Sequence, residues 1–195
     1  MLKSILILIS HLLLISSNPI VEPSSLTPAS TTNFDNIAFI KLGSYRGFKN
    51  DGAEYQKTYF MPRFSQTNWA ESRSFCNSYK MDLLTIETEM ELKAYLNLLN
   101  INSYLRTIPY IQFWADSLTV TLKSKTEWFW TGTGNKISFP ISWIGTEPNN
   151  DGGSEHCLVI FKPSVNANFG FADGNCNIHR YALCQKLDLL IPNLL

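Results

Sequence analysis

The sequence has no excess of charge of either sign, because 16 Lys and Arg residues balance 16 Asp and Glu residues over 195 positions. It therefore lacks the basic surface that binding to nucleic acid or to an anionic membrane requires. It also lacks the Gly-x-Ser-x-Gly and His-Glu-x-x-His motifs and any phosphate-binding glycine loop. These absences disfavour a nucleic-acid-binding protein and an enzyme.

Long apolar runs are scarce, and the longest lies near the N-terminus at residues 5–15. Lys3 precedes this run and two serines follow it, which is the order of a secretory signal peptide with a small-residue cleavage site. A membrane anchor, the alternative, needs about 18 or more apolar residues, and two polar residues interrupt this run. We therefore expect a signal peptide over residues 1–17, a secreted, extracellular protein and no membrane span.

The chain has no Asn-x-Ser/Thr sequon, so N-glycosylation is not expected. Residues 18–37 are instead rich in Pro, Ser and Thr as far as position 33, a composition that cannot bury enough apolar area to fold alone. We expect this segment to be a linker that is open to O-glycosylation. The folded domain is expected over residues 38–187, and a short tail over residues 188–195.

Cysteine is also scarce, and the four residues are Cys76, Cys157, Cys176 and Cys184. An even number in a secreted chain predicts two disulfides, although the spacing alone allows three pairings. Zinc is the other common use of cysteine. It is disfavoured because there is no Cys-x-x-Cys pair, and because only His156 and His179 remain after the signal peptide is removed.

Two segments in the first half of the folded region predict helices. Asn68 followed by Glu71 fits a capping box, and a helical face with Cys76 follows it. Thr88 and Glu91 repeat the capping signature. The apolar face of this second helix has four residues at helical spacing: Leu92, Tyr95, Leu96 and Leu99.

After position 102 the pattern changes to short strand-like runs separated by turns. Four strands are predicted, at residues 110–115, 127–131, 158–161 and 181–185. Two early helices followed by many short strands indicate an α+β domain. Three aromatic residues in strand-like segments are expected to lie in the core: Trp128, Trp130 and Trp143.

Residues 147–157 have no helical period and contain Pro and Gly, so we expect a folded loop. This loop carries Glu147, Asn149 and Glu155, and Asp173 follows further along the chain. Hard oxygen ligands on such a loop suit Ca²⁺. A glycosidase would use Glu147 and Glu155 as its two carboxylates. Two carboxylates that share a short loop with Pro and Asn are better explained by a shared cation.

The order of these motifs along the chain resembles the C-type lectin-like domain. The resemblance rests on segments 68–76, 82–86 and 128–132, on Trp143 and on the Glu-Pro-Asn loop, and it extends over residues 38–187. Leu-Thr-Ile-Glu-Thr at 84–88 is similar to insect secreted members, and four cysteines match the short form of the domain. The resemblance implies two helices, short antiparallel strands and a long calcium-binding loop.

The resemblance also implies a disulfide pattern and a ligand set. It selects the nested pairing of Cys76 with Cys184 and of Cys157 with Cys176. It assigns one Ca²⁺ to four residues that also contact the sugar: Glu147, Asn149, Glu155 and Asp173. The Glu-Pro-Asn order goes with mannose-, glucose- or fucose-type hydroxyls in the family. We expect a cis bond before Pro148, because it would turn both flanking side chains toward one ion.

One expected ligand is missing from the chain. The family has a Trp-Asn-Asp triplet where this sequence has Phe171, Ala172 and Asp173. Ala172 removes one metal oxygen and one amide donor, so metal and sugar affinity should both fall. We expect a protein that binds glycans or glycoproteins weakly through one Ca²⁺, in innate immunity or another extracellular recognition role. The alternative is a calcium-independent lectin-like module that binds proteins.

Overall fold

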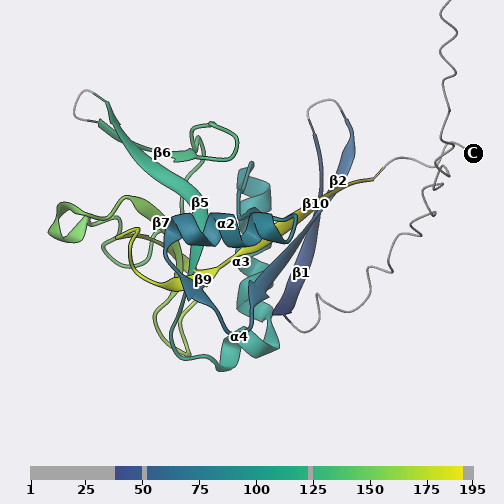
Figure 1. Cartoon of the computed structure of the whole chain (residues 1–195), viewed down its shortest axis with the longest axis horizontal. Helices are drawn as coiled ribbons and strands as arrows, with labels where there is room; N and C mark the ends of the chain where they lie inside the picture. The colour runs from purple at the N-terminus through teal and green to yellow at the C-terminus, as the bar shows by residue number, and fades with distance from the viewer. Residues whose placement is uncertain (1–37, 50–51, 123–124, 191–195) are drawn as a thin grey trace, which may run out of the picture. The chain divides into compact units, whose positions relative to one another are not determined.

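The computed structural model describes residues 38–49, 52–122 and 125–190. The expected signal peptide and linker, residues 1–17 and 18–37, lie outside the described residues. The described part contains the helices α2 (Trp69–Ser78), α3 (Glu89–Ile101) and α4 (Ser103–Thr107) and two β-sheets (Figure 1). The prediction of an α+β domain is confirmed. No helix within these ranges is long and apolar enough to cross a membrane.

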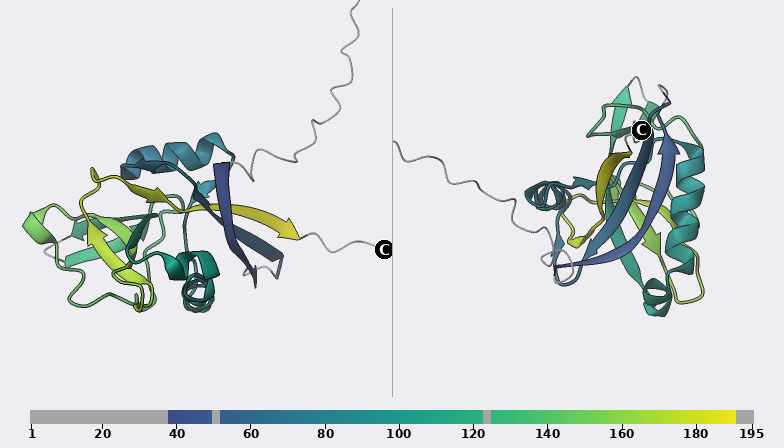
Figure 2. Two further views of the ribbon diagram at one scale, coloured as in Figure 1. Left: turned by 90° about the horizontal axis from the view of Figure 1, so that it is seen from below. Right: turned by 90° about the vertical axis from the view of Figure 1, so that its right-hand side faces the viewer.

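The first sheet has four strands in the order β1-β2-β10-β4. Their bounds are Phe39–Phe48 for β1, Glu54–Pro62 for β2, Cys184–Leu190 for β10 and Asp82–Leu83 for β4. Figure 2 shows β10 running outward beside β2, with which it pairs as far as Leu190. The last strand thus continues three residues beyond the expected domain end at position 187. The β1–β2 hairpin was not predicted from the sequence.

The second sheet carries the candidate site. Its path is β3 (Gln66–Thr67), β9 (Arg180–Ala182), β5 (Ile111–Leu122), β7 (Cys157–Lys162) and β8 (Gly170–Gly174). A further strand, β6 (Lys125–Trp130), pairs with β5 to form the long hairpin visible in Figure 1. Strands β7 and β8 pair antiparallel from Cys157 to Phe161.

The segment predicted as one strand at 181–185 is two strands in different sheets. Leu183 separates β9 from β10 and is fully buried. Its N–H donates to the carbonyl of Trp114, and its carbonyl accepts from the N–H of Leu84. Leu183 therefore carries the chain from one sheet to the other, while both of its backbone groups remain satisfied.

Helix α2 begins with the predicted capping box. The side chain of Asn68 accepts from the N–H of Glu71 at 2.9 Å, and the carboxylate of Glu71 accepts from the N–H of Asn68 at 3.1 Å. The helix buries Trp69 and Cys76. Tyr79, whose spacing from Cys76 would place it on the same helical face, is 43% exposed because the helix ends at Ser78 and leaves Tyr79 at the C-cap.

Helix α3 uses only half of its predicted capping box. The hydroxyl of Thr88 accepts from the N–H of Glu91 at 3.0 Å. The Glu91 carboxylate, however, is fully buried and accepts from Nζ of Lys57 at 2.8 Å and from the hydroxyl of Tyr59 at 3.2 Å. It also accepts from the N–H of Glu87. Glu91 therefore links α3 to β2 by hydrogen bonds and does not accept the N–H of Thr88 that would complete the capping box.

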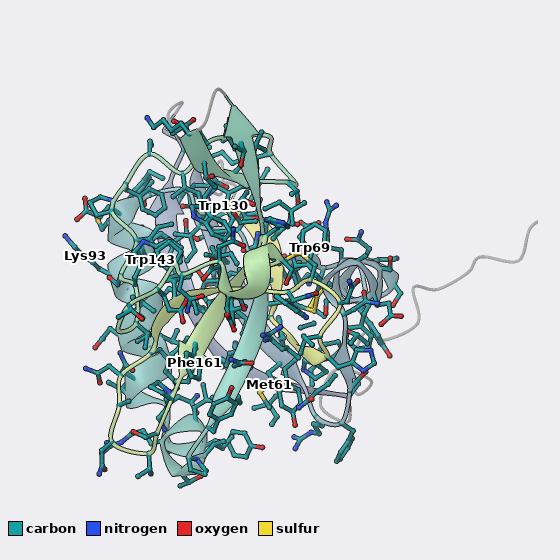
Figure 3. The ribbon with its side chains drawn as sticks, turned by 90° about the vertical axis from the view of Figure 1, so that its left-hand side faces the viewer. Met61, Trp69, Lys93, Trp130, Trp143 and Phe161 are labelled. Atoms are coloured by element: carbon teal, nitrogen blue, oxygen red, sulfur yellow. A yellow bond between two sulfur atoms is a disulfide. The ribbon has the colours of Figure 1, made fainter. Side chains whose placement is uncertain are left out.

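The core has two clusters. The first core cluster includes Tyr59, Leu84, Tyr95, Phe113, Leu158, Phe171 and Leu183. The second core cluster includes Trp69, Cys76, Trp114, Cys157, Val159, Ala172 and Cys184. Trp130 is buried as predicted, and Trp143 is half-buried (Figure 3). Trp128 is also half-buried, and Trp128 and Trp143 both pack against the first core cluster.

Both predicted disulfides are present. Cys76 joins Cys184 and so links α2 to β10. Cys157 joins Cys176 and so links the start of β7 to the segment that follows β8. All four cysteines are therefore used in disulfides.

Candidate metal centre

The segment between β6 and β7 is held against β8 at both ends. Near its start, the N–H of Ile144 donates to the carbonyl of Phe171, and the N–H of Phe171 donates to the carbonyl of Ser142. Gly170 permits this approach, because a Cβ there would lie 2.8 Å from the Ser142 carbonyl oxygen. The Cys157–Cys176 disulfide fixes the other end. Residues 147–155 are thus anchored beside the end of β8 that carries Asp173.

Three of the four predicted ligands meet at this place. Glu147, Glu155 and Asp173 each offer a carboxylate oxygen, and these oxygens all lie within 4.8 Å of one another. Glu147 and Glu155 come from the loop and are half-buried, whereas Asp173 comes from β8 and is buried. Residues distant in sequence therefore form one acidic cluster at the junction of loop and sheet.

The loop backbone orients these carboxylates. The Asp173 carboxylate accepts from the N–H of Asn149 at 3.0 Å and from the N–H of Asn150 at 2.8 Å. The N–H of Asp151 donates to Oε2 of Glu155 at 3.0 Å. These hydrogen bonds hold two of the three carboxylates in place without using a side-chain cation.

Asn149, the fourth predicted ligand, contacts the cluster through its nitrogen atoms. Its Nδ2 donates to Oε1 of Glu147 at 2.9 Å, while its Oδ1 accepts from the N–H of Asp151 at 2.8 Å. The Glu147–Pro148 peptide bond is cis, as expected from the sequence. Asn149 therefore lies beside the carboxylates, with its side-chain oxygen bonded inside the loop.

The electrostatics of the cluster favour binding of a cation. Oε2 of Glu147 is buried and has no hydrogen-bond partner among the described residues. Burial, together with the nearby carboxylates of Asp173 and Glu155, raises the pKa of Glu147 to about 7. A buried, unpaired carboxylate oxygen is costly. A divalent cation with a preference for oxygen ligands, such as Ca²⁺, would remove that cost, so the residues present fit such an ion.

Ala172 supplies no oxygen and faces away from the loop. It lies in β8 opposite Val159, is 4% exposed and belongs to the second core cluster. Neighbouring residues of a strand point to opposite faces. Residue 172 therefore shares its face with Gly174, where a Cβ would lie 3.0 Å from Nη2 of Arg180.

Two residues near the site were not identified from the sequence. Asn150 adopts a left-handed conformation with φ of 47°, and its Oδ1 accepts from the N–H of Glu155 at 3.1 Å. Asn followed by Asp-Gly is a turn signature that could have indicated this role. Arg180 is 9% exposed and stacks over the Trp114 ring at 4.4 Å. No local sequence pattern indicates that contact.

Comparison with known sequences agrees with this architecture. The family model for the Lectin C-type domain matches residues 65–186, which is more than half of the chain. P-selectin of Rattus norvegicus is 29% identical over 120 residues, covering 60% of this chain and 14% of that protein. C-type lectin domain family 4 member K of Mus musculus is 29% identical over 143 residues, covering 72% of this chain and 38% of that protein. The chain therefore spans less than half the length of each of these two relatives.

Solved structures share the fold. The C-type lectin domain of murine dendritic cell inhibitory receptor 2 matches with a TM-score of 0.52 and 21% identity, covering 68% of this chain and 91% of that one. The C-type lectin CEL-I of Cucumaria echinata matches with a TM-score of 0.50 and 18% identity, covering 74% and 96%. At these identities the likeness establishes the fold alone. Together with the family match, it shows that this chain belongs to the C-type lectin domain family, whose domains are binding modules and not enzymes.

Proposed function

We propose that this chain is a secreted glycan-binding protein that uses one Ca²⁺ held by Glu147, Asn149, Glu155 and Asp173. The observation that carries the proposal is the acidic cluster, in which oxygens of three carboxylates lie within 4.8 Å of one another and one buried oxygen of Glu147 has no partner in the described part of the chain. Such a cluster is unfavourable without a cation and favourable with one.

The side chains of the loop offer both the hydrogen-bond acceptor and the hydrogen-bond donor that a sugar hydroxyl requires. A hydroxyl both donates and accepts a hydrogen bond. Oε1 of Glu147 is an acceptor, and Nδ2 of Asn149 is a donor 2.9 Å away. Bound Ca²⁺ would act as a Lewis acid that is coordinated by lone pairs of the sugar hydroxyl oxygens. The order of acceptor and donor in Glu-Pro-Asn, by resemblance to the family, favours mannose- or fucose-type glycans.

Affinity at this site is expected to be low. Ala172 packs in the core and supplies no side-chain oxygen to the ion, and the loop lies at the surface. A weak single site gains avidity when several copies bind one glycan-bearing surface. We therefore expect function on multivalent glycans or glycoproteins instead of free monosaccharides.

The relatives support an extracellular glycan as the ligand. The murine receptor domain with this fold was solved in complex with an N-glycan. A disulfide-bonded domain of this family indicates an extracellular location. We infer a short-form, insect-type secreted member that acts in innate immunity or another extracellular recognition role.

A calcium-independent protein-binding module is the second candidate. One observation favours it: backbone N–H groups of the loop already occupy oxygens of Asn149, Glu155 and Asp173. A loop that satisfies its own donors and acceptors in this way can be folded without a metal.

A glycan array probed with and without EDTA separates the two candidates. The proposal predicts binding to mannose- or fucose-bearing glycans that EDTA abolishes and that Glu155→Gln reduces. Lys93→Gln, a change on the outer side of α3, is the matched control and should bind as the wild type does. A folded protein that binds no glycan in Ca²⁺ but captures a protein ligand in EDTA would favour the second candidate.

A further inference from the structure

A polar cavity lies at the end of β7 opposite the metal centre. Its volume is about 250 Å³. Glu155 comes shortly before the first residue of β7, whereas the cavity lies beside its last residue, Lys162. The other lining residues come from α3, from α4 and from the β7–β8 connection: Leu99, Asn100, Arg106, Val165, Asn166, Ala167, Asn168 and Phe169.

Lys162 gives the cavity a fixed positive charge. It is 2% exposed. Its Nζ donates to the carbonyls of Leu105 at 3.0 Å, Arg106 at 3.3 Å and Ile108 at 2.8 Å. These three bonds use all the N–H donors of the Lys162 side chain, so it contributes to the cavity by its charge and not by a free donor. No carboxylate lines the cavity, and Lys162 forms no ion pair within the described ranges.

Arg106 adds a second positive charge, which is free to bind a ligand. Its side chain is exposed and, in the described part of the chain, has neither a hydrogen bond nor an ion pair. A guanidinium group offers five N–H donors in a planar arrangement that matches an oxyanion.

The amide side chains supply further donors. Oδ1 of Asn100 accepts from the N–H of Phe169 at 2.8 Å, which fixes the amide and leaves its Nδ2 available. Asn166 and Asn168 are exposed and also line the cavity. The buried side chains of Leu99 and Phe169 form an apolar part of the lining.

We infer that this cavity binds a sulfate group, either as the free ion or carried on a sugar. The free guanidinium of Arg106 and three amides, with no acid beside them, form a lining complementary to an anion with several acceptor oxygens, and the buried charge of Lys162 adds to the positive potential. The volume exceeds the roughly 30 Å³ that one water occupies in the liquid, so part of a sugar ring also fits. This site goes beyond the proposed function, because it needs no Ca²⁺ and uses none of the metal-site residues.

The test is an NMR titration of the ¹⁵N-labelled full chain in EDTA, at ionic strength held constant with NaCl. Sodium sulfate should cause saturable shifts in the amide of Phe169 and its neighbours. N-acetylglucosamine 6-sulfate and unsulfated N-acetylglucosamine form the other two arms. Tighter binding of the sulfated sugar than of free sulfate identifies a sugar-borne group, and equal affinity identifies the ion. Shifts caused equally by the unsulfated sugar would overturn the inference.

Arg106→Gln should weaken sulfate binding about tenfold or more, as expected for the loss of one charge-assisted hydrogen bond. Arg106→Lys should retain part of the affinity, because it keeps the charge. The control is Lys93→Gln, which removes a charge from the outer side of α3 (Figure 3), where Lys93 pairs with Glu89, and should leave affinity unchanged. Absence of saturable shifts, or unchanged affinity in Arg106→Gln, would overturn the inference. Glu155→Gln should leave sulfate binding intact, so failure of the calcium site and failure of this site are distinguishable.

Discussion

Asn149 donates from Nδ2 to Oε1 of Glu147 at 2.9 Å, while Oε2 of the same carboxylate is buried and has no hydrogen-bond partner within the ranges that the structure describes. One oxygen of Glu147 is therefore satisfied within the loop and the other is not. The charge on Glu147 is costly in the metal-free protein, because burial removes it from water and because two further carboxylates lie within 4.8 Å. The protonation of Glu147 and the binding of a cation are consequently linked.

This linkage predicts that stability depends on pH in opposite ways with and without metal. The pKa of Glu147 rises from 4.5 to about 7 on folding. The folded metal-free state therefore holds a proton that the unfolded state has lost, so its stability falls as pH rises through this interval. In EDTA, we expect Tm to decrease between pH 5 and pH 7.5. In millimolar Ca²⁺ the decrease should shrink or reverse, because a cation favours the charged carboxylate. Glu147→Gln should remove the difference in slope, and parallel slopes for the wild type would contradict the linkage.

Ala172→Asn tests whether residue 172 can reach the ion. Without metal, Asn would bury an amide in the second core cluster, beside Val159, and should lower stability by about 1–3 kcal/mol. If the side chain turns toward Ca²⁺, it restores one oxygen and one N–H donor. Calcium and mannose affinity should then both increase about tenfold. We would measure both affinities by calorimetry and the metal-free stability by urea unfolding.

Ala172→Val is the matched control, because it adds volume without an oxygen. It should not tighten Ca²⁺. Unchanged calcium and sugar affinity in a folded Ala172→Asn protein would mean that residue 172 faces only the core, as the alternation of β8 side chains suggests for the metal-free chain.

The buried pair of Lys57 and Glu91 is expected to dominate the attachment of α3 to β2. The two side chains are 1% and 0% exposed, with Nζ and Oε1 2.8 Å apart. Lys57→Met leaves a buried carboxylate without its cation, which should cost about 3–5 kcal/mol of unfolding free energy. The double variant Lys57→Met, Glu91→Leu should recover most of this loss, because neither charge remains buried.

Lys93→Met is the control for that experiment. Lys93 pairs with Glu89 one turn away on the exposed side of α3. Exposed pairs of this kind contribute about 0.3–0.5 kcal/mol. Urea unfolding of the four proteins gives the comparison. If Lys57→Met had the same free energy of unfolding as Lys93→Met, the buried pair would contribute no more to stability than the exposed pair.

Local sequence patterns predicted the parts of the fold that depend on residues close together in the sequence. The capping box of Asn68 and Glu71 and the apolar face of α3 depend on residues three or four positions apart, and both are confirmed. The disulfide pairing and the cis bond at Pro148 came from the resemblance, and both are confirmed. The capping box and the apolar face of α3 can be predicted from the sequence because few alternative structures satisfy the same local chemistry.

The features that were missed depend on distant partners. Strand β2 has a buried Lys57 in its centre, so its sequence shows neither clean alternation nor a continuous apolar run. Glu91 was assigned to a cap, because its partner Lys57 lies 34 residues away. The split at Leu183 depends on backbone bonds to Leu84 and Trp114. Periodicity within one segment contains no information about these contacts.

The candidate site shows the same division. Oxygen-bearing residues on the loop could be chosen from composition and resemblance, and the structure brings Glu147, Glu155 and Asp173 together. The hydrogen bonds that join Asn150 to Asp173 and Glu155 depend on the left-handed backbone conformation of Asn150. An Asn residue tolerates this conformation, but its presence in the sequence does not predict it.

Calorimetric titration of the EDTA-treated, dialysed protein with CaCl₂ at pH 7.5 tests the central claim most directly. The acidic cluster predicts saturable binding of one Ca²⁺ per chain, and Glu155→Gln should weaken it about tenfold or more because one charged ligand is lost. A folded protein that shows no saturable heat up to 10 mM Ca²⁺, with Tm unchanged by the metal, would contradict the claim.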